Sequence, residues 1–87
     1  MEYQELIDLC KGAYNSGNLS SAYKYWEMIY GVLDKKLSKI DKHNKVEIQE
    51  RYDEFNEYMN QFSDKEVYDI TDYGKEQAYL KMGYLGI

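Results

Sequence analysis

The chain holds one cysteine and one histidine, Cys10 and His43, the residue types most often used for nucleophilic or zinc chemistry. A structural zinc site takes four protein ligands, so one residue of each type cannot form one. Cys10 also falls on the apolar side of a predicted helix, where a buried, inert thiol is the ordinary finding. We therefore expect neither residue to carry chemistry, unless the fold brings the two together.

Carboxylate pairs are the next candidates for chemistry. Asp53 and Glu57 are four residues apart and could serve as an acid and a base or bind calcium, but the loop glycine and alternating oxygen ligands of a calcium site are missing. A glycine-rich phosphate loop is missing too, because Gly83 and Gly86 do not open a helix. The sequence therefore predicts a protein that is not an enzyme and has no cofactor.

Acidic residues gather in the stretch EIQERYDEFNEYMNQF, residues 47–62, in which Arg51 is the only base. At helical spacing, the acids lie on the side opposite the apolar residues Ile48, Tyr52, Phe55 and Met59. We call these five acids the acidic ridge: Glu47, Glu50, Asp53, Glu54 and Glu57. The ordinary interpretation of such a row is a solvated helix face.

Two features favour a binding role for the acidic ridge. Like charges at these spacings cost about 0.2–0.5 kcal/mol per pair, yet lysines are not interleaved with them. More acids follow it, so the row could continue onto the next element, where a cationic groove would accept it in place of a phosphate backbone. Tyr58 and Tyr68 could then stack where bases would. The candidate binding residues are Glu47, Glu50, Asp53, Glu54, Glu57, Tyr58, Tyr68, Asp69 and Asp72.

The charge of the chain is distributed unevenly. Residues 1–42 hold six acids and six bases, whereas residues 43–87 hold ten acids and five bases and so carry the whole net charge of −5. A negative domain repels phosphate backbones, which argues against direct nucleic-acid binding and for a basic protein partner. The eleven tyrosines exceed what a small core can satisfy, so several should lie on an adhesive surface.

The elements that position these residues are predicted to be helices. The chain has no proline, and its apolar residues recur mostly at spacings of three and four. We expect helices over residues 2–16, 20–41, 45–62 and 64–82, with a turn at Gly17-Asn18 and a cap at Asn44. With 87 residues, this is a single all-α domain, a small bundle of three to four helices.

The second helix carries the longest apolar stripe, which marks it as the centre of the bundle. Gly31 interrupts this helix at a cost of about 1 kcal/mol relative to alanine, so we expect another backbone to approach it closely. The stripe comprises Leu19, Tyr23, Trp26, Tyr30, Leu33, Leu37 and Ile40, with Ala22 and Ile29 beside it. The first helix should face inward with Tyr3, Leu6, Cys10 and Ala13.

The last segment, residues 64–82, suits two structures. Ser63 and Glu66 have the spacing of a capping box, which predicts a helix with Val67, Ile70, Ala78 and Met82 on its inner face. Gly74 interrupts this pattern, and the β-branched and aromatic residues before it would also suit a β-hairpin. We expect the helix and retain the hairpin as the alternative.

The stretch LIDLCKGAYNSGNLSSAYKYWEMI resembles one tetratricopeptide repeat, over about 34 residues within 3–36. Leu9, Gly17, Ala22 and Trp26 stand where that repeat has leucine, glycine, alanine and an aromatic residue. Ala13, Ile29 and Asp34 depart from its pattern, and a second repeat is not visible. The resemblance implies an antiparallel helical hairpin, and a peptide-binding groove is not carried over from it.

The charge, size and lack of motifs predict a binding module that inhibits a larger protein through a basic, nucleic-acid-binding patch, such as that of a nuclease. In this it resembles, as a class, the small acidic inhibitors of phages and mobile elements, anti-CRISPR proteins among them. We expect a cytoplasmic protein of a bacterial or phage-infected cell, because the chain starts without a signal-like segment and lacks a long apolar run. The alternative is a repeat-like adaptor or oligomerisation subunit with a merely solvated acidic face.

Overall fold

A computed structural model describes residues 2–85, which form four α-helices and no strand. The helices are α1 (Tyr3–Asn15), α2 (Leu19–Ser38), α3 (Lys45–Met59) and α4 (Asp64–Leu85). The predicted all-α class is confirmed, and residues 64–82 are helical, so the hairpin alternative is wrong. Within the described residues, no helix has the length and apolarity that a membrane span requires.

The connection from α1 to α2 closes in a Schellman motif. The amide of Asn18 donates to Ala13 O at 2.9 Å, and the amide of Gly17 donates to Tyr14 O at 3.0 Å. Gly17 adopts a φ of +82°, which glycine reaches without a steric penalty. Asn18 then caps α2, because its side chain accepts from the amide of Ser21. The predicted turn therefore follows from two adjacent residues.

A side-chain N-cap starts α3, and a capping box starts α4. Asn44 Oδ1 accepts from the amide of Glu47 at 3.2 Å, and its Nδ2 donates to the Glu47 carboxylate at 3.0 Å. Ser63 Oγ accepts from the amide of Glu66, whose carboxylate accepts from the amide of Ser63 at 2.8 Å. Both caps lie where the sequence predicts them. Two helices end earlier than predicted. Helix α2 ends at Ser38 rather than at residue 41, and α3 ends at Met59 rather than at residue 62.

The core lies between α1, α2 and the inner sides of α3 and α4. On α2 the buried residues are Trp26 and Leu33 of the predicted stripe and Ala22 and Ile29 beside it, whereas Tyr30 of the stripe is 42% exposed. Phe62 follows the end of α3 and still packs edge-on against Trp26, at 5.1 Å between ring centroids. The buried residues are Tyr3, Leu6, Ile7, Cys10, Ala22, Trp26, Ile29, Leu33, Phe55, Phe62 and Ile70.

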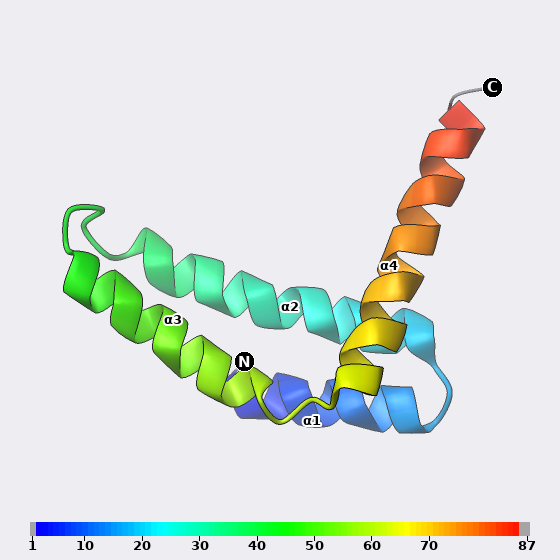
Figure 1. Ribbon diagram of the computed structural model, residues 1–87, viewed down its shortest axis with the longest axis horizontal. Helices are drawn as coiled ribbons and strands as arrows, with labels where there is room; N and C mark the ends of the chain where they lie inside the picture. Colours follow the sequence, from blue (N-terminus) through cyan, green and yellow to red (C-terminus); the bar gives the residue numbers. More distant parts are fainter. Residues whose placement is uncertain (1, 86–87) are drawn as a thin grey trace.

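Helix α4 belongs to this core only in its first half. Val67 packs against the core and Ile70 is fully buried, but Ala78 and Met82 are exposed, so the predicted inner face is wrong beyond Gly74. Figure 1 shows the reason, because α4 crosses α2 near its own start and then projects away from the other three helices. Within residues 2–85, the apolar residues beyond the crossing have no neighbouring helix to pack against.

The prediction for Gly31 is also wrong. Gly31 is exposed, and a Cβ built there would have no atom within 4 Å. The close approach occurs at Gly74 instead, where a Cβ would lie 2.3 Å from the ring of Tyr23. The sequence does not show whether a glycine inside a helix faces solvent or a neighbouring helix. Periodicity could therefore not predict that Gly74, and not Gly31, is the position of close approach.

Candidate functional site

Cys10 and His43 do not form a pair in the structure. Cys10 is fully buried and its Sγ donates to Ala22 O at 3.2 Å, while burial, aided by the charge of Glu66, raises the pKa of the thiol to about 11. His43 is exposed in the connection from α2 to α3 (Figure 1), where its amide donates to Asp41. Among the described residues, no group of three or more potential ligands could hold a metal ion.

The acidic ridge is divided by the structure and does not form one exposed row. Glu54 is turned toward α2, where its carboxylate lies 2.7 Å from Lys36 Nζ and 3.5 Å from Arg51 Nη1. The hydrogen bond to Glu54 is the main cause of the raised pKa of the Lys36 ammonium. Glu47 accepts a hydrogen bond from the side chain of Asn44, the N-cap of α3, at 3.0 Å. These two carboxylates therefore have structural partners.

The other three members of the acidic ridge, Glu50, Asp53 and Glu57, are exposed on the side of α3 opposite the buried Phe55. We call these three residues the α3 outer face. Asp53 accepts one hydrogen bond from Gln49 of the same helix, at 2.9 Å. Within the part of the chain that the structure describes, none of the three forms an ion pair.

Tyr58 is half-buried rather than displayed on the surface. Its ring lies 5.1 Å from that of Tyr3, and it lines a hollow of about 480 Å³ together with Glu54, Glu57 and Gln61. Tyr3 is buried with its hydroxyl unpaired among the described residues, and burial, more than the nearby charges, raises the pKa of this phenol. Lys36 Nζ stands 4.5 Å from the centre of the Tyr3 ring. Tyr58 thus belongs to a packed aromatic cluster.

The acids of α4 do not continue the acidic ridge, since α4 turns sharply away from α3 after the link at residues 60–63 (Figure 1). Asp69 accepts from Tyr14 Oη of α1 at 2.5 Å and from Lys65 Nζ at 2.8 Å. The bond from Lys65, then that from Tyr14, lowers the pKa of this carboxyl. Asp72 is half-buried, and Tyr68 is 68% exposed on the outside of α4.

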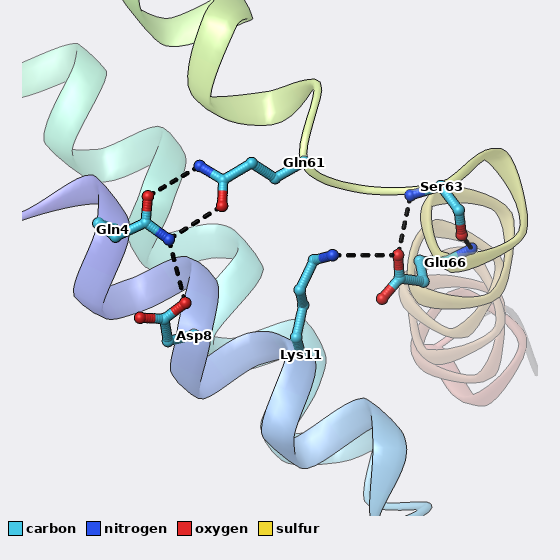
Figure 2. A network of polar contacts seen from close by, with 6 residues as sticks. All are labelled: Gln4, Asp8, Lys11, Gln61, Ser63 and Glu66. Atoms are coloured by element: carbon cyan, nitrogen blue, oxygen red, sulfur yellow. Dashed lines mark hydrogen bonds and ion pairs between the residues drawn. The ribbon is translucent and has the colours of Figure 1, made fainter.

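Glu66 links the start of α4 to α1. Burial alone would raise the pKa of this carboxyl, but hydrogen bonds from Ser63 and the ammonium of Lys11, 3.6 Å away, lower it on balance. Figure 2 shows Lys11 reaching from α1 to Glu66. Glu66 and Asp69 therefore help to fix α4 on α1, a role that their positions in the sequence do not reveal.

Sequence reasoning missed the contact between Gln4 and Gln61. Each amide donates to the other, at 2.9 and 2.8 Å, and Gln4 also donates to Asp8 (Figure 2). The pair joins the first turn of α1 to the link between α3 and α4. The two residues are 57 positions apart, and a single sequence contains no signal for such a pairing.

No protein-family model, curated protein or solved structure matches this chain.

Proposed function

We propose that the protein is a non-enzymatic binding module whose α3 outer face docks on a basic patch of a larger protein. The observation that carries this proposal is the row of Glu50, Asp53 and Glu57, exposed on one side of α3 and without an ion pair among the described residues. Carboxylates in such a row complement a cationic groove and speed the encounter with it.

The division of the acidic ridge supports this choice of residues. Glu54 is paired with the Lys36 ammonium, which offsets its charge, and the Glu47 carboxylate is held by the Asn44 amide at the start of α3. The outer three carboxylates are spaced three and four residues apart on a helix whose opposite side holds Phe55 in the core. This face can therefore be presented to a partner without disturbing the fold.

The class of partner follows from the charge. A domain with a net charge of −5 avoids nucleic acid and favours a surface built to bind it, such as the basic groove of a nuclease or another nucleic-acid enzyme. Inhibition of that kind is the mode of the small acidic phage-type inhibitors, anti-CRISPR proteins among them, that the chain resembles as a class. The action would lie in the bacterial or phage-infected cytoplasm.

The test begins by capturing binding proteins from a nuclease-treated bacterial lysate. The captured protein is then titrated with the parent and with the triple variant Glu50→Gln, Asp53→Asn, Glu57→Gln. Each desolvated charge-assisted contact contributes about 1.5–3 kcal/mol, so we expect the triple variant to bind at least tenfold more weakly. We also expect a shallower dependence of affinity on salt, because fewer charges are screened.

A matched control removes the same three charges from exposed positions elsewhere, with Glu27→Gln, Asp34→Asn and Glu76→Gln. This control should bind like the parent. If the two triple variants weaken binding equally, only net charge matters and the α3 outer face has no special role. If both triple variants bind as tightly as the parent, with the same salt dependence, the carboxylates of the α3 outer face are solvated and do not contact the partner.

A further inference from the structure

Helix α4 presents apolar surface that the described part of the chain leaves uncovered. Tyr68 on the outer side of its first half is 68% exposed, Tyr79 and Met82 in its second half are 71% and 66% exposed, and Figure 1 shows the second half standing clear of α1, α2 and α3. Helices in proteins owe most of their stability to packing, and a short segment without it is marginal in water. We therefore looked for a partner helix that could pack against this surface of α4.

Three of the exposed apolar residues of α4, Tyr68, Tyr79 and Met82, lie on one line with the half-buried Asp72 and the exposed Lys75. Tyr68, Asp72, Lys75, Tyr79 and Met82 are separated by four, three, four and three residues, the spacing of a two-helix seam. We call these five residues the α4 stripe. It lies on the side of α4 opposite Ile70 and Gly74, which face the body.

The α4 stripe is complementary to itself when one copy is reversed. In an antiparallel pair of α4 helices, Tyr68 stands opposite Tyr79 of the second copy, and Asp72 stands opposite Lys75 of the second copy. The two-fold axis repeats both pairs, so the centre carries two opposite-charge contacts flanked by two aromatic ones. A parallel pair would instead place like charges together. Charge and spacing thus favour a second copy of α4 as the partner, in the antiparallel orientation.

We propose that α4 pairs antiparallel with α4 of a second copy of this chain, with reciprocal Asp72–Lys75 ion pairs at the centre of the seam. Because each body lies on the face of α4 opposite the α4 stripe, the two bodies fall on opposite sides of the paired helices. In this register Met82 stands opposite Lys65 of the second copy, so the matched seam runs only from Tyr68 to Tyr79, about 16 Å at 1.5 Å per residue, and buries less area than a standard interface. The dimer is therefore weak and depends on concentration.

This inference goes beyond the proposed function and is independent of it, since no residue of the α3 outer face takes part. The dimer would present two α3 outer faces, so a target with two basic patches would be bound with higher avidity. The α4 stripe also assigns Tyr68 and Asp72 to self-association rather than to the acidic binding surface.

The test uses charge reversal in the full chain, with the oligomeric state measured by sedimentation velocity from micromolar to millimolar protein. We expect the parent to shift from monomer to dimer as concentration rises. Asp72→Lys and Lys75→Asp each place like charges at both central contacts and should weaken the dimer about tenfold or more. The double variant Asp72→Lys with Lys75→Asp restores opposite charges and should dimerise like the parent.

Mixing the two single variants gives a second restoration, because Asp72→Lys chains and Lys75→Asp chains are complementary to each other and not to themselves. Glu76→Lys is the matched control, since it makes the same charge change on the same helix outside the α4 stripe and should dimerise like the parent. Circular dichroism checks that each variant remains helical. A parent that stays monomeric at millimolar concentration, or folded double and mixed variants that stay monomeric, would overturn the proposal.

Discussion

The ring of Tyr23 on α2 lies directly against the backbone of Gly74 on α4, so that a Cβ at residue 74 would be 2.3 Å from Tyr23 Cε1. The same ring packs at 6.0 Å from that of Tyr73. The crossing of α4 over α2 therefore depends on a residue without a side chain. Gly31, also inside a helix, has open space around it.

These two glycines should respond in opposite ways to alanine. Gly31→Ala should stabilise the protein by about 0.5–1 kcal/mol, because alanine has the higher helix propensity and nothing obstructs its methyl group. Gly74→Ala should destabilise it, because the methyl group displaces the Tyr23 ring from the crossing. Chemical denaturation measures both free energies of unfolding. Tyr23→Ala removes the ring that obstructs the methyl group, so Gly74→Ala should be stabilising in that background. If Gly74→Ala stabilised the parent protein, the packing of Tyr23 against Gly74 would be contradicted.

Trp26 is the largest side chain at the centre of the core and only 7% exposed. Trp26→Ala should cost about 3–5 kcal/mol, because it leaves a cavity between Phe62 and Tyr30, which pack against the indole. Val46→Ala, at a site 72% exposed, serves as the control and should change the free energy of unfolding by less than about 0.5 kcal/mol. Equal melting temperatures for the two variants would show that the core is wrongly assigned.

Protonation of Asp69 at acid pH should lower the stability of the protein. Its pKa is lowered in the folded state by Lys65 and then by Tyr14, so its contribution is complete above the unfolded pKa, about 4, and is lost as the pH falls through the folded pKa. Asp69→Asn should therefore melt below the parent at pH 7, with the two melting temperatures converging below pH ~4. Tyr14→Phe, which removes one donor and keeps the ring, should lower stability at pH 7 by a smaller amount. A gap that stays constant with pH would mean that Asp69 makes no charge-dependent contact.

Cys10 should be inert in the folded protein, because its thiol is buried, donates to Ala22 O and has a pKa of about 11. Alkylation by iodoacetamide at pH 8 should proceed only as fast as the protein unfolds. Cys10→Ala should lose modest stability, and both Cys10→Ala and His43→Gln should bind the captured partner like the parent. Loss of binding in either folded variant would mean that the residue participates in function.

The sequence alone determined the helices of this protein and most of what lies in its core. The absence of proline, the three-and-four spacing and the caps at Asn44 and Ser63 are local features, and local features act within one or two helical turns. Periodicity identifies an inner side, so Trp26, Leu33, Phe55 and Ile70 were predicted to be buried. The acidic row on α3 was equally visible.

The tertiary structure decided which of those residues are free. Glu54 is paired because α2 places Lys36 beside it, Asp69 is paired because α1 places Tyr14 beside it, and Met82 is exposed because α4 leaves the body after Gly74. Each outcome depends on where a helix distant in the sequence comes to lie. Periodicity describes one helix at a time, whereas ion pairs and uncovered faces are properties of two helices packed together, or of one left without a neighbour.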